Sequence, residues 1–292
     1  MVSLIVATVN RLDELERLLT SLEKQIYRDF EVIVVDQNPD NRLVAVLAAH
    51  DRLEIKHVRC ARGLSRARNA GLRLARGDLI AIPDDDCWYP PDLLESVVRW
   101  FEIHPEFGLL GVATRTEENR PSGPNSPRKG RRCTKDTVWG CGVSPALFLR
   151  RSVTDAVGSF DEEIGVGAAS RYQSGEETDY ILRALELGFR MWFEPSLTVH
   201  HPAFDSLERL KKTTYSFALG TGRILRVHKY SLFQVGAHLL RSCGGAVVSV
   251  LRGNLGKARV YMLRALGQLV GYLAAGHLLR SSHQYRSTPC RS

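Results

Sequence analysis

The alternation of short apolar runs with amphipathic helical patterns constrains the fold of this chain more than any other feature. The apolar runs occupy residues 2–8, 31–36, 54–58 and 79–83, and helical patterns lie between them at residues 12–24, 41–49 and 64–75. Continuous runs of Val and Ile are what strands buried on both faces require. Strands and helices that alternate over short connections predict right-handed crossovers. We therefore expect an α/β fold with a mostly parallel, Rossmann-like central sheet flanked by helices.

This domain is expected to continue to residue 204. Its later elements are a helix after Pro90-Pro91, a strand at 108–113, a polar loop at 115–134, an ordered stretch at 138–150, a helix at 151–157, a Gly-rich loop at 164–175, a helix from Glu176 to Gly188, and strands at 189–194 and 197–201. Beyond them no strand pattern remains. We therefore predict two parts, an α/β domain at 1–204 and a helical appendage at 205–292.

The appendage is strongly basic. It carries fourteen of the 40 Lys and Arg residues but only two acids, Asp205 and Glu208, so its net charge is +12 against −4 for residues 1–204. Its two most apolar stretches, 232–251 and 258–279, are interrupted by arginines and predict basic amphipathic helices. Such helices bind an anionic membrane surface, pack on a second subunit, or present a solvated face. We expect a peripheral association with the inner face of the cytoplasmic membrane.

Neither a signal peptide nor a disulfide framework is expected. The chain enters a strand pattern at Val2 without a basic leader segment. Its six cysteines are scattered, with none in a CxxC pair, and a chain of 292 residues can bury a core without covalent staples. These features indicate free thiols in a cytoplasmic protein.

Polar residues follow three of the predicted strands, at the point where each strand ends. These segments are Thr8-Val9-Asn10-Arg11, Asp36-Gln37-Asn38 and Asp84-Asp85-Asp86. Ligands bind at the carboxyl ends of the strands in open α/β sheets, so these segments form the candidate site. The first turn lacks the Gly-rich patterns GxGxxG and GxxxxGK[ST] that cradle nucleotide phosphates. A bound nucleotide would therefore need a divalent cation to neutralise its phosphates.

The run Asp84-Asp85-Asp86 supplies ligands for such a cation. Three adjacent carboxylates repel one another, which disfavours their ionisation. A bound Mg²⁺ or Mn²⁺ removes that repulsion, using one or two carboxylates together with substrate phosphates. The alternative is an acidic turn that caps the helix after Pro90. We favour the metal site because the apolar Ile80-Ala81-Ile82 leads directly into the run.

A second acidic group opens a later helix. Glu176, Glu177 and Asp179 follow a Gly-rich loop, where a carboxylate could face a cleft and act as a general base. Acids in a first helical turn are also favoured by the helix dipole alone. The sequence leaves both interpretations open.

Two basic groups complete the candidates. His200-His201 ends the last predicted strand, and an imidazole there could complete a metal site begun by carboxylates. Arg66 and Arg68 precede the strand that leads to the aspartates. A guanidinium at that place could pair with a phosphate, with the aspartates or with a purely structural partner.

Taken in order, these segments resemble the inverting glycosyltransferases of family 2, which have the GT-A fold. The resemblance covers about residues 2–204 and rests on an ordered set of motifs: Ala7-Thr8-Val9-Asn10-Arg11, Val34-Val35-Asp36, Gly63 to Gly71, Asp84-Asp85-Asp86 as a DxD motif, Trp139-Gly140-Cys141-Gly142, Val157 to Glu162, Gly175 to Asp179, and His200-His201. It implies a nucleotide-sugar glycosyltransferase that depends on Mg²⁺ or Mn²⁺.

The resemblance also implies a role for each matching residue. Nucleotide-sugar binding falls to Thr8, Asn10, Arg11, Asp36, Arg68, Asp84 and Asp85; metal binding to Asp86, Asp84 and His200 or His201, with His200 slightly preferred; and the acceptor or sugar pocket to Trp139, Gly140, Cys141 and Glu176. The family usually has Asp as its base, and the matching residue here is Glu177, whose side chain is one methylene longer. We expect Glu177 to be the base, with Glu176 and Asp179 as alternatives.

The implied reaction is direct displacement, with inversion, of a UDP- or dTDP-linked sugar by a hydroxyl of a glycan or lipid-linked acceptor, in cell-surface polysaccharide assembly. The sequence disfavours two rival functions. A sugar nucleotidyltransferase is disfavoured because no Gly-rich, Lys-bearing loop opens the chain. A nucleic-acid-binding protein is disfavoured because the basic tail shows no aromatic-interleaved platform, zinc pattern or helix-turn-helix. We expect no nucleic-acid partner, while an oligomer remains possible.

Overall fold

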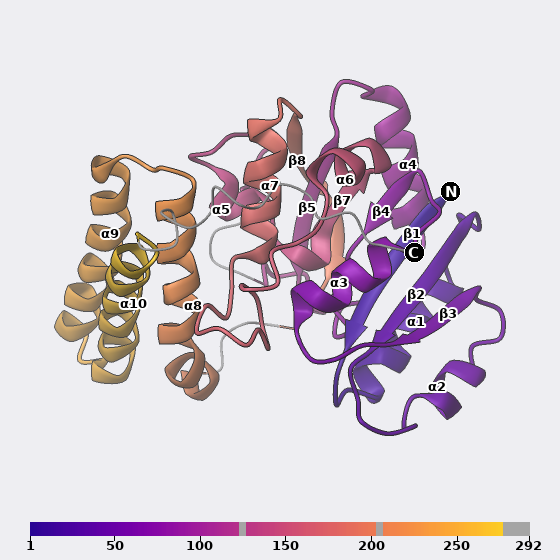
Figure 1. Cartoon of the computed structure of the whole chain (residues 1–292), viewed down its shortest axis with the longest axis horizontal. Coiled ribbons are helices and arrows are strands. Elements are labelled where there is room, and N and C mark those ends of the chain that lie inside the picture. Colours follow the sequence, from indigo (N-terminus) through magenta and orange to yellow (C-terminus); the bar gives the residue numbers. More distant parts are fainter. Residues whose placement is uncertain (123–126, 203–206, 277–292) are drawn as a thin grey trace, which may run out of the picture. The chain divides into compact units, whose positions relative to one another are not determined.

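A computed structural model describes residues 1–122, 127–202 and 207–276 of the chain (Figure 1). Its residues group into two compact units. The first comprises residues 1–162 and 176–204, and the second comprises residues 163–175 together with the chain from residue 205 onward. The loop 163–175 is thus grouped with the C-terminal helices, a placement for which the sequence pattern contains no signal.

The first unit is built on an eight-stranded mixed sheet. Its strands are β1 (Val2–Thr8), β2 (Phe30–Asp36), β3 (Ile55–Arg59), β4 (Leu79–Ala81), β5 (Leu109–Arg115), β6 (Arg131–Cys133), β7 (Leu147–Arg150) and β8 (Met191–His200), in the order β3-β2-β1-β4-β7-β5-β8-β6. The half formed by β3, β2, β1 and β4 is wholly parallel. Strand β7 runs antiparallel between β4 and β5, and β8 is parallel to β5. The expected α/β fold is confirmed, and its parallel half carries the first candidate residues.

Helices pack on both faces of this sheet. Those of the first unit are α1 (Asp13–Glu23), α2 (Val44–Ala48), α3 (Leu64–Leu72), α4 (Leu93–Ile103), α5 (Val138–Cys141), α6 (Arg151–Val157) and α7 (Glu176–Glu186). Side chains alternate between the two faces of a strand. Leu4 of β1 lies in one buried cluster with Leu18 of α1 and Val97 of α4. Its neighbour Ile5 meets α3, where a Cβ on Gly71 would come within 2.2 Å of the Ile5 side chain.

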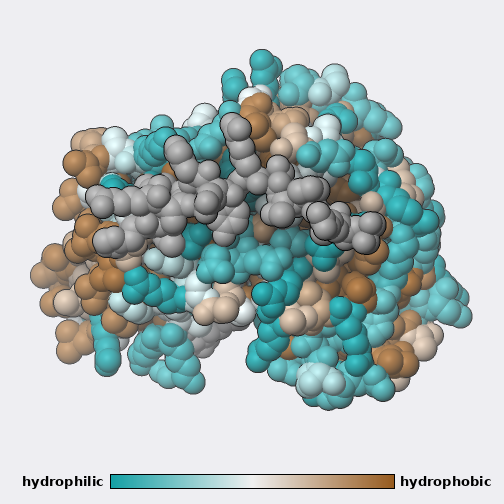
Figure 2. All heavy atoms as spheres, viewed as in Figure 1, coloured by the Kyte–Doolittle hydropathy of each residue, from teal (hydrophilic) through white to brown (hydrophobic). Residues whose placement is uncertain are grey.

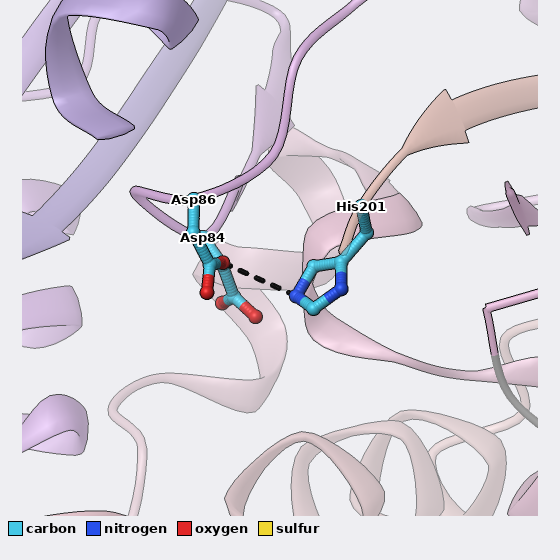
Figure 3. A group of neighbouring side chains, drawn as sticks. All are labelled: Asp84, Asp86 and His201. Atoms are coloured by element: carbon cyan, nitrogen blue, oxygen red, sulfur yellow. Dashed lines mark ion pairs between the residues drawn. The ribbon is translucent and has the colours of Figure 1, made fainter. Parts of the chain in front are cut away.

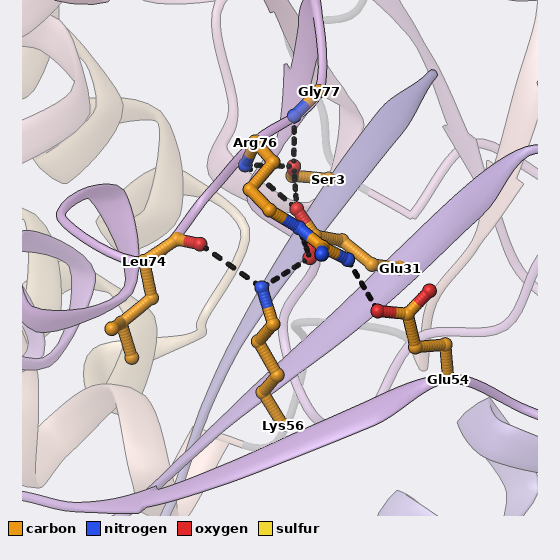
Figure 4. Close-up of polar contacts among 7 residues, drawn as sticks. All are labelled: Ser3, Glu31, Glu54, Lys56, Leu74, Arg76 and Gly77. Carbon is orange, nitrogen blue, oxygen red and sulfur yellow. Dashed lines mark hydrogen bonds and ion pairs between the residues drawn. The ribbon is translucent and has the colours of Figure 1, made fainter.

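A buried carboxylate ties the parallel strands together at their amino ends (Figure 4). Glu31 of β2 has a fully buried side chain. It accepts hydrogen bonds from the Ser3 hydroxyl at 2.7 Å, from the Lys56 ammonium at 2.7 Å, and from the backbone N–H of Arg76 at 2.7 Å. The Arg76 guanidinium also donates to it at 3.1 Å. Burial alone would raise the pKa of Glu31, but these partners outweigh it and lower the pKa to about 2.

Two differences from the expected elements have local causes. Strands expected at 189–194 and 197–201 form one strand, β8, whose pairing with β5 shifts register between Val112 and Ala113. Pro195 lies in the extra residues at this shift, where a residue without an N–H can be accommodated. Strand β6 lies within the stretch expected to be a loop. It is not evident in the sequence because Arg131 and Arg132 are exposed at the sheet edge and show no apolar alternation.

The second unit consists of the expected C-terminal helices and the loop 163–175. The helices are α8 (Leu207–Val227), α9 (Leu232–Leu251) and α10 (Leu255–Ala274). A capping box between Ser231 and Gln234 begins α9, and the Asn254 side chain caps α10. The loop is fastened to α8 by a 2.7 Å hydrogen bond from the Ser174 hydroxyl to the carbonyl of Phe217. Among the described residues, no helix combines the length and apolar character needed to cross a membrane.

Candidate active site

The candidate site lies where the strands end. Thr8, the last residue of β1, is paired with Asp36, the last residue of β2. Asp84 follows β4 and forms an isolated bridge with Ala7. On the other side, the backbones of Trp88 and His200 exchange two hydrogen bonds of 2.9 Å, which brings the end of β8 beside the aspartate run. Segments that are more than a hundred residues apart in the chain therefore meet at one edge of the sheet.

Three side chains at this edge could hold a metal ion (Figure 3). Asp84, Asp86 and His201 each offer a ligand atom, and these atoms lie within 4.8 Å of one another. The Nε2 atom of His201 lies 3.1 Å from Oδ1 of Asp86. Two carboxylates and an imidazole are donors that suit Mn²⁺, and the carboxylates also suit Mg²⁺. Among the described residues this is the one such group.

The structure brings His201, and not the slightly preferred His200, to the aspartates. Consecutive side chains at a strand end point in opposite directions. The His200 ring instead stacks on Trp88, with ring centroids 5.3 Å apart, and the Arg17 guanidinium lies 3.6 Å from the centre of the Trp88 ring. The preference for His200 is therefore corrected to its neighbour His201.

Arg11 joins the other two aspartates. Its Nη1 atom lies 2.6 Å from a carboxylate oxygen of Asp85 and 2.6 Å from one of Asp86. Burial raises the pKa of Asp85 to about 6, although Arg11 opposes this shift. Burial would also raise the pKa of Asp86, but His201 and Arg11 outweigh it and hold that pKa below its ordinary value. Asp86 thus stays ionised, as a metal ligand must.

Arg68 connects the aspartate run to the second acidic group. Its side chain is 2 % exposed, and it donates to Oε1 of Glu176 at 3.0 Å and to Oδ1 of Asp84 at 3.4 Å. The Ser144 hydroxyl donates to the same Asp84 oxygen at 3.0 Å. Burial nevertheless raises the pKa of Asp84. The neighbouring Arg66 turns elsewhere and pairs with Glu162 at 3.0 Å.

The three acids at the start of α7 differ in their surroundings. Glu176 is buried against Arg68. Asp179 is paired with Arg183 at 2.8 Å, one helical turn further on. Glu177 is half-buried, and burial together with the charge of Glu176 raises its pKa well above the ordinary value, although Arg68 opposes this. Glu177 thus differs from Glu176 and Asp179, each of which forms a salt bridge with an arginine.

A cavity of about 400 Å³ lies at the ends of β1, β2 and β3. It is lined by Val9, Asn10, Gln37, Asn38, Pro39, Cys60, Ala61 and Arg62. Asn10 has a left-handed backbone with φ of +57°, and its N–H donates to the Asn38 side chain at 2.8 Å. Asp36 is fully buried behind this lining. Its carboxylate accepts two 2.8 Å hydrogen bonds from Asn38, so it orients a lining residue and does not line the cavity itself.

The expected pocket segment Trp139-Gly140-Cys141 forms α5 and packs against α7. A Cβ on the following Gly142 would come within 2.2 Å of the Ile181 side chain, so this glycine permits the close approach. Cys141 is buried, whereas Trp139 and Gly140 are half-buried. The segment is thereby held next to the helix that carries Glu177.

Two further residues of the site, Ser144 and Arg17, are not evident in the sequence. Ser144 contacts Asp84, and the Arg17 guanidinium lies 3.4 Å from the backbone carbonyl of Asp86. Nothing in the local sequence around either residue distinguishes it from a surface residue of a turn or helix. Asn38 could have been identified, because it ends the polar segment that follows β2.

Comparison by sequence with known proteins matches mainly the N-terminal part of this chain. The family model described as Glycosyl transferase family 2 matches residues 3–158, more than half of the chain. An uncharacterized glycosyltransferase of Haemophilus influenzae is 25% identical over 206 residues, which are 68% of this chain and 64% of that protein. This chain therefore spans slightly less than two thirds of that relative. A glucosyl-dolichyl phosphate glucuronosyltransferase of Haloferax volcanii is 27% identical over 225 residues, 70% of each chain.

Two solved structures share the fold. Residues 1–349 of S. aureus TarS, in complex with UDP-GlcNAc, superpose with a TM-score of 0.59 at 19% identity, covering 98% of this chain and 93% of that one. The mannosyltransferase PcManGT from Pyrobaculum calidifontis, in complex with GDP-Man and Mn²⁺, gives a TM-score of 0.58 at 18% identity, with 99% and 76% covered. At these identities the likeness is one of fold.

Proposed function

Because the chain belongs to glycosyl transferase family 2 and has the GT-A fold, we propose that it transfers a sugar, with inversion, from a UDP- or dTDP-linked donor to a hydroxyl of a glycan or lipid-linked acceptor. The observation that carries this proposal is the buried Arg68, which contacts both Asp84 and Glu176. It links the group that would hold the leaving diphosphate to the helix that would supply the base.

Asp84, Asp86 and His201 would hold Mg²⁺ or Mn²⁺. Such an ion, when bound, neutralises charge on the diphosphate leaving group. The protein's own contribution is to keep Asp86 ionised between Arg11 and His201 and to fix Asp84 through Ser144 and Arg68. The donor complexes of TarS with UDP-GlcNAc and of PcManGT with GDP-Man and Mn²⁺ support a nucleotide-sugar donor and a metal for this chain as well.

Glu177 takes the proton from the acceptor hydroxyl, which attacks the anomeric carbon from the face opposite the diphosphate. Its raised pKa makes this carboxylate a stronger base than an ordinary glutamate. Glu176 and Asp179 are weaker alternatives, because each is already engaged by an arginine. Arg68 would help to place Glu177 by holding the adjacent Glu176.

Replacing the base tests this assignment. Glu177→Gln keeps the size of the side chain but removes its basicity, so we expect donor affinity to be retained and the rate of transfer to fall by about 10²–10⁴-fold. The matched control is Glu186→Gln, an exposed position at the other end of α7. Equal turnover in both variants would remove Glu177 from the role.

A donor screen tests the substrate class. Thermal unfolding is followed with UDP-, dTDP- and GDP-linked sugars, each with Mn²⁺ and with a chelator. A ligand at a hundred times its Kd stabilises the folded state by about 2.7 kcal/mol. We expect a metal-dependent rise in Tm with one nucleotide class. Transfer that is insensitive to the chelator would contradict the metal assignment.

The acceptor of the sugar determines the cellular role of the enzyme. We infer a part in cell-surface polysaccharide assembly at the cytoplasmic face of a membrane, where lipid-linked acceptors are found. The basic C-terminal helices support this location. The family match favours neither of the rival functions, a sugar nucleotidyltransferase or a nucleic-acid-binding protein.

A further inference from the structure

Helix α9 has its large apolar side chains on the outside. Phe233, Leu240, Val247 and Leu251 recur every seven or four residues on one face, and they are 86 %, 73 %, 58 % and 80 % exposed. The buried positions of the helix are Val235, Ser242, Ala246 and Ser249. An ordinary surface helix has the opposite arrangement, with the large apolar residues turned towards the core. The face that α9 buries is small and partly polar.

Helix α10 repeats this inverted pattern. Its exposed stripe is Leu255, Met262, Leu266, Leu269 and Leu273, again at helical spacing. Its buried positions include Ala258, Gly267, Gln268 and Gly271. Between the two helices, the Ser242 hydroxyl and the Gln268 side chain form a buried hydrogen bond of 3.1 Å. Figure 2 shows apolar residues gathered over these helices.

The small buried residues allow backbones to touch. A Cβ on Gly271 would come within 2.2 Å of the carbonyl oxygen of Leu219 on α8, and one on Gly267 within 2.7 Å of Ala218. On α8 itself, a Cβ on Gly222 would come within 2.2 Å of the carbonyl oxygen of Gln268. These close approaches need small residues on the buried side of the helices, which leaves the large apolar residues of α9 and α10 facing outwards.

The charges on this surface have one sign. Helices α9 and α10 contain no Asp or Glu. The exposed basic residues are Arg241, Lys257, Arg259 and Arg264 in the helices and Arg252 at the end of α9. Arg259 lies within the apolar stripe of α10 at the same helical spacing. An apolar surface with interspersed basic residues complements the interface of an anionic bilayer, where apolar side chains enter the acyl boundary and cations meet phosphate headgroups. Self-association through the same faces would bring arginines of two copies together.

We propose that the outward faces of α9 and α10 form a docking surface for an anionic lipid bilayer. Phe233, Leu240 and Leu251 of α9 enter the headgroup region beside Leu266 and Leu273 of α10, and the basic residues bind lipid phosphates. The inference rests on the membrane location within the proposed function and not on the transfer chemistry. Vesicle binding is measured without donor or acceptor, so its failure is distinguishable from a failure of the transferase assignment.

Flotation of the full chain with vesicles tests the docking surface. Phosphatidylcholine vesicles with and without phosphatidylglycerol are compared. We expect strong flotation with the anionic vesicles, and at least about a tenfold loss of bound protein when Leu240→Glu and Leu266→Glu are combined. The matched control combines Ile103→Glu and Leu187→Glu, which change exposed apolar residues of the first unit. The control should float like the unchanged protein, and circular dichroism should show that both variants are folded.

A second variant separates charge from apolar contact. Arg252→Gln with Lys257→Gln should weaken binding to anionic vesicles by about fivefold for each charge removed, with no change on neutral vesicles. The proposal is overturned if the unchanged protein does not float with anionic vesicles, or if the Leu240→Glu, Leu266→Glu variant floats equally well. Sedimentation velocity provides one further test. If the unchanged protein is a dimer, the Leu240→Glu, Leu266→Glu variant is a monomer, and vesicle binding is the same for both, then the faces bind a second copy and the proposal is overturned.

Discussion

A single buried carboxylate and a run of three lie at opposite ends of the same parallel strands, and their surroundings differ. At the amino ends, Glu31 is fully buried and is met by the side chains of Ser3, Lys56 and Arg76, which lower its pKa to about 2. At the carboxyl ends, Asp85 is almost as deeply buried but shares the Arg11 guanidinium with Asp86. Its pKa is raised to about 6.

This difference is the one that we expect between a structural carboxylate and a ligand-binding one. Glu31 has two cationic partners, Lys56 and Arg76, which more than offset the cost of burying its charge. The run Asp84–Asp86 gathers three carboxylates, but Arg11 is shared between Asp85 and Asp86. Arg68 is shared between Asp84 and Glu176. We expect such a group to cost stability in the free protein and to gain it with a bound cation, as functional sites commonly do. Substitutions at the two ends should therefore act on different properties.

The largest expected effect is a loss of activity, caused by a substitution at the carboxyl ends of the strands. Asp86→Ala removes the carboxylate that faces both Arg11 and His201, and with it the charge that would hold the metal. Several kcal/mol of transition-state stabilisation correspond to a loss of about 10³-fold in kcat/KM. Initial rates with the donor found in the screen would measure it. Glu95→Ala, at an exposed position of α4, is the control. A variant that retains a tenth of the activity would place the metal elsewhere.

At the amino ends the expected effect is on stability. Glu31→Gln leaves Lys56 and Arg76 without their carboxylate. Both cations are partly exposed and can turn towards water, so we expect a loss of about 2–3 kcal/mol of unfolding free energy, below the full cost of breaking a buried pair. Urea denaturation at neutral pH measures this loss, and kcat should not change. Glu54→Gln removes the exposed partner of the same Arg76 and should cost less than about 1 kcal/mol.

The pH dependence of stability tests whether the lowered pKa of Glu31 causes this stabilisation. Because the folded pKa of Glu31 lies below its ordinary value of 4.5, its contribution is present above that value and is lost as the pH falls towards about 2. Between pH 5 and pH 3 the unchanged protein should lose about 2 kcal/mol more than Glu31→Gln. Parallel curves for the two proteins would mean that the Glu31 network does not lower this pKa.

Local patterns were enough to predict much of this architecture. Continuous Val and Ile runs marked β1 and β2, and helix α6 has the expected bounds of 151–157. The aspartate run was identified because an apolar strand leads into it. These predictions succeed because the burial of a strand and the polarity of its end are properties of neighbouring residues.

Contacts between distant segments could not be predicted in this way. Arg68 and Glu176 are 108 residues apart, and either could have had another partner. The choice between His200 and His201 depends on the backbone pairing of His200 with Trp88, which fixes the side of the strand end on which each imidazole lies. The inverted faces of α9 and α10 required a structure too, because apolar periodicity does not say whether a stripe faces inwards or outwards.

The smallest expected effect is a gain in stability at Asp85, whereas substitution of Glu31 is expected to lower stability. Asp85→Asn keeps the shape of a buried side chain and removes one of three adjacent negative charges, while Arg11 retains Asp86 as a partner. With a chelator present, we expect Tm to stay constant or to rise by about 2–4 °C, the change that 1 kcal/mol produces in a chain of this size. Differential scanning calorimetry of Asp85→Asn, Glu31→Gln and the unchanged protein measures both changes in Tm under the same conditions. A fall of several degrees for Asp85→Asn would mean that Arg11 satisfies Asp85 as fully as Lys56 and Arg76 satisfy Glu31. The aspartate run would then be a structural network, and the contrast between the two ends of the sheet would not hold.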